Sequence, residues 1–425
     1  MLKEIQKTAD KLRADGVPSG GRVAIISEPA GEFVILTLAC WKIGAVIVPI
    51  STRYPPEKVN SALKTINCKK VLIGDELSLI APRTTPITLD QLDLDLNADA
   101  SIIFTSGSSG EPKGALHTIA NHYYNALGSH ENIPFGPGHA WLASLPMYHI
   151  SGFSLIMRAL IAGGTIVFPQ PQAPLADAIM HPAVTHLSVV PTQLKRLLEE
   201  SLCVERLRKL NAILVGGSAI PPGLIERAVL AGLPVCATYG STEAASQIAT
   251  GRPGIKAGAR VLSHRQVKIA GDGEILVKGK TIFKGYVQGD SVESAVDAQG
   301  WFHTGDTGSL GEGGNLHAAG RKDLMFICGG ENIHPEEIER ALKDIDQIEH
   351  AVVVPIDDPE FGKRPAAFIK TKDNQPLDRG KIKTTLRKTL EPFKIPKTFH
   401  PWPESVPPSL KAQRRSLIRI AKRQS

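Results

Sequence analysis

The chain has few cysteines and few aromatic residues. Its five cysteines, among 425 residues, are scattered and form neither a Cys-x-x-Cys pair nor an even framework: Cys40, Cys68, Cys203, Cys236 and Cys328. This usage argues against a disulfide-stabilised secreted protein and favours reduced, mostly buried thiols. We therefore expect a cytoplasmic protein.

A long hydrophobic run is also missing. The most apolar stretch, residues 33–50, contains Lys42 and Gly44 and ends in Ala-Val-Ile-Val-Pro-Ile. A buried helix followed by a buried strand accounts for it better than a membrane span. The first residues, Met-Leu-Lys-Glu-Ile-Gln, carry charges where a signal peptide needs apolar side chains. We expect no secretion signal and no stable membrane insertion.

Positive charge is in excess, but its arrangement is not typical of nucleic-acid-binding proteins. The formal net charge is +7 and the pI is about 9.0, which suits anionic ligands such as nucleotides. Aromatic residues make up only 5% and do not alternate with a basic stripe. The basic residues 411–423 are expected to form a solvated helical face, with a nucleic-acid-binding tail as the alternative. We expect no nucleic-acid partner.

The pattern of apolar segments predicts an α/β fold. A chain of this length, 42% hydrophobic and 21% charged, is expected to form two or three globular domains. Apolar strands alternate with helical segments, as in parallel sheets covered on both faces. The expected helices span 4–14, 31–42, 118–128, 152–162, 191–200, 221–231, 335–343 and 378–390; the expected strands span 22–27, 45–49, 70–74, 101–104, 141–145, 165–168, 186–190, 212–215, 234–238, 273–278 and 350–354.

Two changes in the pattern of predicted strands and helices indicate the domain organisation. Short strands with glycine-rich turns begin near residue 258, and a second alternation of helices and strands follows Gly320. We expect a large N-terminal domain over residues 1–320, made of stacked, mostly parallel sheets with helices and a β-rich subdomain from about 258. Residues 321–425 are expected to form a small C-terminal α+β domain.

One segment carries a strong chemical signal. Residues 105–114 read Thr-Ser-Gly-Ser-Ser-Gly-Glu-Pro-Lys-Gly and follow the apolar residues 101–104. Glycines let consecutive N–H groups turn toward an anion, hydroxyls add donors, and lysine adds a point charge. The segment lacks the P-loop spacing, and a flexible linker fits poorly between apolar segments. It predicts a phosphate-binding loop.

A second cluster, Tyr-Gly-Ser-Thr-Glu at 239–243, follows the predicted strand 234–238. Ligands bind beyond the carboxyl ends of parallel strands, so Thr242 could donate to a phosphate and Glu243 could bind Mg²⁺. A helix N-cap at Ser241 or Thr242 explains the same residues.

Two further clusters are ambiguous by themselves. Gly-Trp-Phe-His-Thr-Gly-Asp at 300–306 places Asp306 to accept from ribose hydroxyls or to form an ordinary Asx turn. Gly-Gly-Ser at 216–218 either leaves room for a flat ring or makes a simple turn from strand to helix.

Together, in this order, these motifs and Gly-Arg-Lys-Asp at 320–323 resemble the adenylate-forming superfamily, which includes acyl-CoA synthetases, luciferases and nonribosomal adenylation domains. The resemblance runs from about residue 20 to the C-terminus. It implies an enzyme that uses ATP and Mg²⁺ to make an acyl-adenylate and then transfers the acyl group to CoA. The small domain is then expected to be mobile.

The resemblance also implies roles for individual residues. The β- and γ-phosphates of ATP would lie in the loop formed by Thr105, Ser106, Gly107, Ser108, Ser109, Gly110 and Lys113. Adenine would lie between Gly217 and Ser218 on one side and Tyr239, Gly240 and Ser241 on the other. Thr242 would contact the α-phosphate, Glu243 would bind Mg²⁺, and Asp306, assisted by Arg321, would bind ribose. Asp323 would be the hinge of the small domain, and Gly330 would line the path of the CoA arm.

The catalytic lysine of the superfamily has to be located in an altered motif. In the superfamily this lysine lies in the pattern Pro-x-x-x-x-Gly-Lys-x-x-Arg-x-x-Leu. The downstream half of that pattern fits residues 407–417 with Lys411 as the lysine, although the glycine is missing and the preceding loop is short. Counting forward from Pro407 instead reaches Gln413, which would cripple adenylation. The superfamily's further N-terminal segment is also absent, which suggests a truncated gene model or a pared-down enzyme.

Residues 144–162 indicate the acid. Ser-Leu-Pro-Met-Tyr-His places His149 where these enzymes gate the acyl pocket, and an apolar helix with a single arginine, Arg158, follows. A buried guanidinium is costly unless an anion meets it, whereas one at a helix edge reaches solvent. Together with the motifs that begin Val-Pro-Thr-Gln at residue 190, Gly-Gly-Glu-Asn-Ile at residue 329 and Phe-Gly-Lys-Arg-Pro at residue 361, the pattern is similar to the 2-succinylbenzoate–CoA ligases of menaquinone biosynthesis. Arg158 would then meet the benzoate, and Thr192 and Gly240 would also line the acid site.

Three alternatives stay open. The chain could be another aryl- or medium-chain acyl-CoA ligase, an ATP-binding relic without ligase activity, or a domain that adenylates for a carrier protein, which the absence of a following carrier domain disfavours. The expected partners are small molecules, namely the carboxylic acid, ATP and CoA. The sequence leaves a homo-oligomer open.

Overall fold

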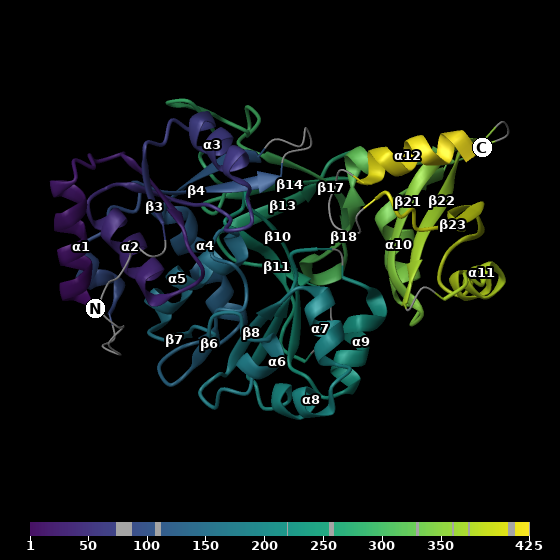
Figure 1. The fold of residues 1–425 in the computed structure, drawn as a ribbon, viewed down its shortest axis with the longest axis horizontal. Helices are drawn as coiled ribbons and strands as arrows, with labels where there is room; N and C mark the ends of the chain where they lie inside the picture. Colours follow the sequence, from purple (N-terminus) through teal and green to yellow (C-terminus); the bar gives the residue numbers. More distant parts are fainter. Residues whose placement is uncertain are drawn as a thin grey trace.

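The computed structural model describes residues 1–73, 87–106, 112–218, 220–254, 259–328, 331–358, 361–372, 375–406 and 413–424. Figure 1 shows two bodies. The large one contains the two largest sheets, and the smaller one, at the right, carries the C-terminal elements. No helix in these ranges has the length and apolar character needed to cross a membrane.

The first sheet has seven strands among the described residues and is parallel only in its N-terminal half. Its order is β16-β15-β5-β4-β2-β1-β3, with parallel pairing from β4 to β3 and antiparallel pairing from β4 to β16. The strands are β1 (Arg22–Ile26), β2 (Val46–Pro49), β3 (Lys70–Ile73), β4 (Asp99–Ser106), β5 (Pro112–Thr118), β15 (Gly285–Gln288) and β16 (Ser291–Glu293).

The second sheet has eleven strands in the described part and also changes direction. Its order is β13-β14-β17-β18-β12-β11-β10-β9-β8-β6-β7, parallel from β10 to β7 and antiparallel from β10 to β13. The strands are β6 (Ala140–Leu142), β7 (Thr165–Val167), β8 (His186–Val189), β9 (Ala212–Val215), β10 (Val235–Ser241), β11 (Ser246–Thr250), β12 (Ala259–Val261), β13 (Arg265–Ile269), β14 (Glu274–Gly279), β17 (Phe302–Leu310) and β18 (Asn315–Arg321).

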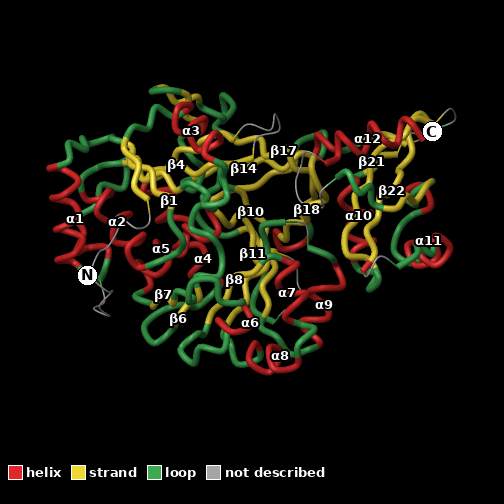
Figure 2. Tube along the Cα trace, viewed as in Figure 1, coloured by secondary structure: helices red, strands yellow, loops and turns green. Residues whose placement is uncertain are grey.

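Helices fill the space between the sheets and cover their outer faces. The main core combines apolar side chains of α2, α4 and α5 with strands of both sheets, and Phe33 and Phe153 meet edge to face in it. A second core lies beneath α7 to α9. Figure 2 shows these helices in red around the yellow strands. The helices are α1 (Leu2–Ala14), α2 (Gly31–Lys42), α3 (Pro56–Thr65), α4 (Ile119–Asn132), α5 (Ile150–Ala162), α6 (Leu175–Ala178), α7 (Pro191–Leu197), α8 (Ser201–Leu207) and α9 (Pro222–Leu230).

The smaller body has its own hydrophobic cores. Helices α10 and α11 pack on one face of the sheet β21-β22-β23, and α12 packs on the other, where Leu417 and Ala421 are buried. Its elements are β19 (Phe326–Cys328), β20 (Glu331–Ile333), α10 (Pro335–Lys343), β21 (Ile348–Asp358), β22 (Gly362–Thr371), α11 (Arg379–Leu386), β23 (Thr398–Pro401) and α12 (Gln413–Gln424).

Most expected elements form close to their expected positions, and the α/β fold class is confirmed. The predicted helix 191–200 is wrong in its last three residues: α7 ends at Leu197, ahead of Glu199 and Glu200, and α8 begins at Ser201. Acidic residues are unfavourable at a helix C-terminus because of the helix dipole. The predicted helix 378–390 is also too long, since α11 ends at Leu386.

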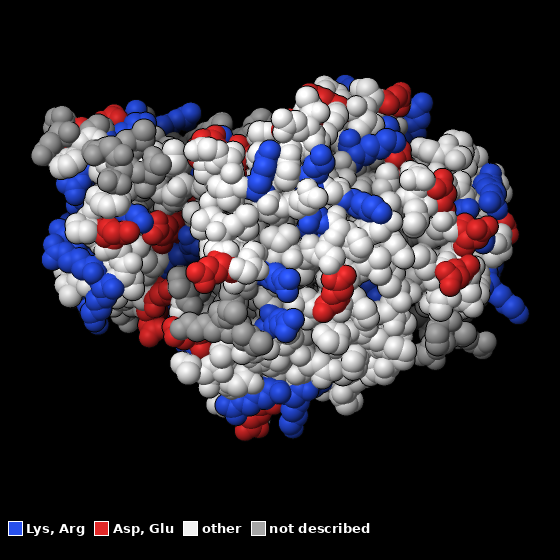
Figure 3. Space-filling model, turned by 180° about the vertical axis from the view of Figure 1, so that it is seen from behind, with Lys and Arg blue, Asp and Glu red and all other residues white. Residues whose placement is uncertain are grey.

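Charge is mixed on the face opposite the view of Figure 1. Figure 3 shows Lys and Arg interspersed with Asp and Glu there, rather than gathered in one basic patch. On this face, the net positive charge of the chain is therefore not arranged as a track for a polyanion.

Candidate active site

The segment 239–243 ends β10 and enters a β-hairpin turn. Residues 242–245 connect β10 to β11, and Ser241 pairs with Ser246 across the turn. The helix N-cap considered for Ser241 and Thr242 is therefore wrong, because the backbone folds back as a strand. Ala245 and Ser246 have φ values of 55° and 117°, an uncommon conformation for residues with side chains. Such strain persists where surrounding contacts hold it, often at functional sites.

Several buried contacts hold this turn. Asn125 on α4 donates through Nδ2 to the carbonyls of Ala244 and Gln247, at 3.0 Å each. His117 on β5 lies 2.7 Å through Nε2 from the carbonyl of Thr242. A carbonyl only accepts, so Nε2 carries the proton. Burial lowers the pKa of His117, which keeps the ring neutral.

Gly240 is required where β10 and β11 approach. A Cβ on Gly240 would meet the Ser246 carbonyl oxygen at 1.8 Å, and the strand register shifts between Tyr239 and Gly240. A glycine thus lets the backbone pass closely at this position.

Glu243 is held from the segment that enters β15. Its carbonyl accepts from the backbone N–H of Phe283 at 2.8 Å, and its carboxylate Oε1 accepts from the Tyr286 hydroxyl at 2.8 Å. Mg²⁺ in nucleotide sites is bound through one or two carboxylates together with phosphates and water. A single oriented carboxylate fits that requirement, although the described residues contain no group of three or more metal-binding side chains.

Asp306 lies on β17 with a partner for each carboxylate oxygen. Tyr239 donates its hydroxyl to Oδ2 at 2.7 Å, and Arg321, paired with Asp306 across β17 and β18, lies 3.4 Å from Oδ1 through Nη1. Burial raises the pKa of Asp306, and the two partners oppose that shift. The alternative interpretation of Asp306 as part of an ordinary Asx turn is wrong, because side chains from two other strands fix its carboxylate.

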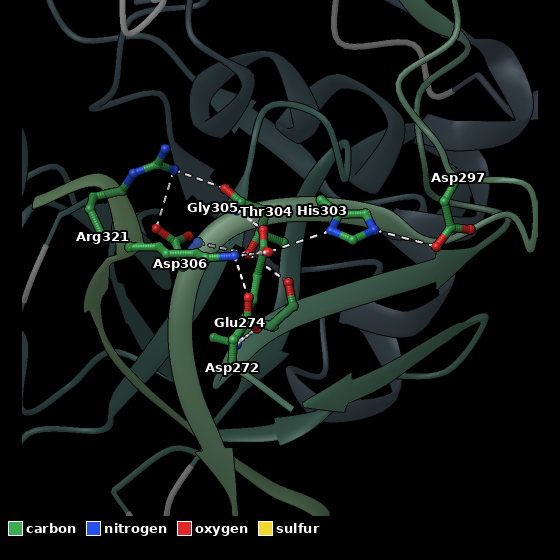
Figure 4. A network of polar contacts seen from close by, with 10 residues as sticks. Asp272, Glu274, Asp297, His303, Thr304, Gly305, Asp306 and Arg321 are labelled. Atoms are coloured by element: carbon green, nitrogen blue, oxygen red, sulfur yellow. Dashed lines mark hydrogen bonds and ion pairs between the residues drawn. The ribbon is translucent and has the colours of Figure 1, made fainter. Parts of the chain in front are cut away.

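Glu274, which is buried, supports the turn before Asp306, and Figure 4 shows its contacts. Glu274 on β14 accepts from the N–H of Gly305 at 2.9 Å through Oε1 and forms an ion pair with Lys322 at 2.9 Å through Oε2. Lys322 also pairs with Asp272 at 2.5 Å. The ion pair joins the Asp306 turn to the segment leading into the small body.

The residues that flank the predicted phosphate loop lie on two paired antiparallel strands. Thr105 on β4 pairs with Lys113 on β5, and Ser106 pairs with Pro112. Gly107, Ser108, Ser109 and Gly110 lie outside the described residues. The second of these strands, β5, also carries His117, whose ring contacts the Thr242 carbonyl.

The four residues predicted for the acid lie on three elements: His149 at the start of α5 and Arg158 within it, Thr192 on α7 and Gly240 on β10. His149 is exposed at the start of α5, where its ring meets Tyr148 at 4.7 Å. Thr192 is exposed on α7. Arg158 is only 4% exposed. The alternative prediction, an arginine that reaches solvent from the edge of a helix, is therefore wrong.

Arg158 is buried without a carboxylate among the described residues. It donates through Nη2 to Gln247 Oε1 at 3.0 Å and to Ser246 Oγ at 3.4 Å, and it lies over Trp141, 5.4 Å from the ring centroid. Its Nε is buried with no hydrogen-bond partner in the described part of the chain. Burial lowers its pKa to about 10. The guanidinium therefore has capacity for an anion.

The remaining predicted site residues lie in three different parts of the chain. Gly217, with φ of 80°, and Ser218 follow β9 and are exposed in the connection to α9. Asp323 accepts from Arg321 Nε at 3.1 Å, at the junction of the two bodies. Gly330 and Lys411 lie outside the described residues.

The two bodies meet through named contacts beside this site. The N–H of Arg321 donates to Glu336 Oε2 at 2.8 Å, and Arg340 donates to the carbonyl of Ala319 at 2.7 Å. A cavity of about 330 Å³ lies between β17, β18 and His334. Thr307 lines it, and because strand side chains alternate, the neighbouring Asp306 faces the other side of the sheet. The cavity is therefore separate from the Asp306 site.

Sequence reasoning missed three supporting residues, namely His117, Glu274 and Tyr286. Glu274 lies in the strand segment Gly-Glu-Ile-Leu-Val that the pattern predicted, but nothing local shows that its carboxylate turns toward Gly305. His117 and Tyr286 likewise have no local signal, because their partners are more than forty residues away in the chain.

Residues 1–287 match the family described as AMP-binding enzyme, and residues 337–408 match the AMP-binding enzyme C-terminal domain. The chain is 32% identical over 436 residues to the 2-succinylbenzoate–CoA ligase of Bacillus licheniformis, covering 94% of this chain and 89% of that protein. It is 31% identical over 416 residues to the enzyme of the same name from Listeria innocua, covering 93% of this chain and 88% of that protein.

The solved structures to which this chain is similar include enzymes named for the same acid. The chain superimposes with a TM-score of 0.83 and 30% identity on o-succinylbenzoate CoA synthetase from Bacillus subtilis in complex with the acyl-adenylate intermediate OSB-AMP, covering 98% of this chain and 92% of that one. The same synthetase in complex with ATP and magnesium ion matches with a TM-score of 0.83 and 29% identity, covering 97% and 93%. The R195K form from E. coli with bound OSB-AMS matches with a TM-score of 0.79 and 29% identity, covering 99% and 92%.

Proposed function

This chain belongs to the AMP-binding enzyme family, and we propose that it is an AMP-forming acid–thiol ligase that converts 2-succinylbenzoate, ATP and CoA to 2-succinylbenzoyl-CoA in menaquinone biosynthesis. The observation that carries the proposal is the similarity to 2-succinylbenzoate–CoA ligases over more than nine-tenths of the chain. The oriented carboxylates of Glu243 and Asp306 support the nucleotide part of that activity.

The reaction has two steps. An oxygen of the succinyl carboxylate attacks the α-phosphorus of ATP, the bond from that phosphorus to pyrophosphate breaks, and pyrophosphate leaves with the electron pair. The sulfur of CoA, after loss of its proton, then attacks the acyl carbon, and AMP leaves. Neither step needs a protein nucleophile, so the chain contributes mainly positioning and charge neutralisation.

We assign the nucleotide-binding roles as follows. Asp306 accepts from the ribose hydroxyls with Arg321 beside it, Thr242 contacts the α-phosphate, and Glu243 holds Mg²⁺, which supplies positive charge to the phosphates when bound. The hairpin loop that begins at Thr105 and returns at Lys113 holds the β- and γ-phosphates. Adenine lies between the segment 216–218 and the end of β10. Asp323 is the hinge between domains 1–320 and 321–425.

We assign the second carboxylate of the acid to Arg158. Its burial, its unpartnered Nε and the absence of an ion-pair partner among the described residues support the assignment. His149 and Thr192 complete the acid site in this proposal. Arg158→Leu should harm turnover of 2-succinylbenzoate far more than turnover of a monocarboxylic arylbutyrate, and equal losses on both acids would contradict the assignment.

We assign the adenylation lysine to Lys411. Lys411→Ala should abolish adenylate formation but spare thioester formation from preformed adenylate, whereas equal loss of both steps would contradict it. CoA is the proposed acyl acceptor, with Gly330 on the path of its arm. The scattered cysteines support a cytoplasmic location, and neither a nucleic acid nor a membrane belongs to the proposal.

The decisive experiment uses the purified chain with ATP, Mg²⁺ and a panel of acids, with and without CoA. Formation of AMP, pyrophosphate and thioester with 2-succinylbenzoate alone would support the proposal. Turnover of other aryl or medium-chain acids instead would reassign the substrate, and no turnover with any acid would favour an ATP-binding protein without ligase activity.

A further inference from the structure

Tyr286 joins two elements of the proposed ATP site that are far apart in the sequence. It lies on β15, which pairs antiparallel with β5 so that Tyr286 is opposite Ala115. Side chains two residues apart on a strand share one face, so Lys113 lies on the same face as Ala115 and close to the Tyr286 ring. The ring is further fixed by Phe283, which meets it edge to face at 4.9 Å.

The hydroxyl end of Tyr286 orients Glu243. It donates to Oε1 at 2.8 Å, while the N–H of Phe283 donates to the backbone carbonyl of Glu243 at 2.8 Å. The segment 283–286 therefore fixes both the backbone carbonyl and the side-chain carboxylate of Glu243. With Oε1 engaged as an acceptor, Oε2 can be presented to a metal ion with little freedom of rotation, and a charge-assisted hydrogen bond of this kind is stronger than a neutral one.

The ring face of Tyr286 meets Lys113. The ammonium nitrogen of Lys113 lies 5.2 Å from the ring centroid, within the range of a cation–π contact. Lys113 is exposed and has four rotatable bonds, so its ammonium samples many positions unless a surface holds it. The aromatic face supplies that surface.

We propose that Tyr286 is a positioning residue that holds the Glu243 carboxylate through its hydroxyl and the Lys113 ammonium on its ring, and so sets the distance between the metal ligand and the charge that meets the ATP phosphates. This inference rests on the proposed function. It predicts separable losses, since the hydroxyl acts on metal binding and the ring acts on phosphate binding.

Two substitutions separate these contributions. Tyr286→Phe keeps the ring and removes only the hydroxyl, so the affinity for Mn²⁺–ATP should fall roughly tenfold while metal-free ATP binds as in the wild type. Tyr286→Leu removes both, so metal-free ATP should also bind about threefold more weakly. Isothermal titration calorimetry with ATP, with and without Mn²⁺, and electron paramagnetic resonance of bound Mn²⁺ give both quantities without turnover.

The matched control is Tyr124→Phe, because Tyr124 also combines a hydroxyl hydrogen bond with a cation–π contact. Its hydroxyl accepts from Lys280 Nζ at 3.1 Å, and the same nitrogen lies 4.3 Å from the ring centroid. This substitution should leave both affinities unchanged. Unchanged Mn²⁺–ATP affinity in Tyr286→Phe, or equal weakening with and without metal, would overturn the proposal. Failure of the wild-type chain to activate 2-succinylbenzoate would overturn only the substrate assignment, because the binding measurements do not use the acid.

Discussion

The hydroxyl of Tyr239 donates to Oδ2 of Asp306 at 2.7 Å, although 67 residues separate the two in the chain. Tyr239 lies on β10, where the second sheet changes from parallel to antiparallel pairing, and Asp306 lies on β17 in the antiparallel part. The proposed ribose-binding carboxylate is thus oriented from both parts of the sheet.

This hydrogen bond should control the pH dependence of nucleotide binding. Burial raises the pKa of Asp306, while Tyr239 and Arg321 lower it. The ionised carboxylate accepts from ribose, so affinity for ATP is lost as the pH falls through the raised pKa. Removing the hydroxyl in Tyr239→Phe leaves burial less opposed, so the acid limb of kcat/KM for ATP should move to higher pH. An acid limb at the wild-type position would contradict this role.

Glu274 should affect ATP more than the acid. In Glu274→Gln the ion pair with Lys322 is lost and the support of the Gly305 N–H is weakened. A hydrogen bond to a charged group contributes about 1.5 kcal/mol, so KM for ATP should rise roughly tenfold. Steady-state kinetics with each substrate varied in turn measures this change. Asp297→Asn is the control, since Asp297 contacts His303 through Oδ2 (Figure 4) and the amide keeps the oxygen that accepts from the N–H groups of Gln299 and Trp301. A rise in both KM values would point to general misfolding instead.

His117 should stabilise the 242–245 turn. In His117→Leu the carbonyl of Thr242 loses its donor inside the protein, which should cost about 1–3 kcal/mol of unfolding free energy. Denaturant titration at neutral pH tests this, with the exposed His130→Leu on α4 as the control. Equal stability of His117→Leu and the wild type would show that the turn does not depend on this contact.

The same histidine should make stability depend on pH. Burial lowers its pKa in the folded chain, so the unfolded chain binds the proton first as the pH falls. The stability contributed by neutral His117 is complete above the ordinary histidine pKa and is lost as the pH falls toward the lowered value. His117→Leu should therefore lose less stability on acidification than the wild type, and a steeper loss would contradict the assignment.

The small body should depend on a largely buried ion pair. Arg414 on α12 lies 2.7 Å from Glu339 on α10, and Glu339 also accepts from the N–H of Val353 at 2.7 Å. Removing one partner of a buried pair costs about 3–5 kcal/mol, so Arg414→Met should lower the thermal unfolding temperature. The double variant Arg414→Met with Glu339→Leu should recover part of that loss, because no uncompensated charge remains. A double variant less stable than Arg414→Met would count against this explanation.

Much of the architecture followed from local patterns. The helix predicted at 335–343 is α10, residue for residue, because its apolar positions repeat at helical spacing after Pro335. The antiparallel half of each sheet was harder to predict from the sequence. For example, β15 pairs with β5 across more than 160 residues, and no local signal specifies that pairing.

The site shows the same division. The sequence by itself determined the glycine- and hydroxyl-rich loop at 105–114 and the two carboxylates, Glu243 and Asp306, because residue type and short spacing define such motifs. Only the tertiary structure decided that 239–243 enters a hairpin rather than a helix and that Arg158 is buried. It also decided which side chains orient the carboxylates, namely Tyr286 and Tyr239. The physical reason is that hydrophobic periodicity and turn chemistry act over a few residues, whereas the pairing of distant strands sets which hydroxyl meets which carboxylate.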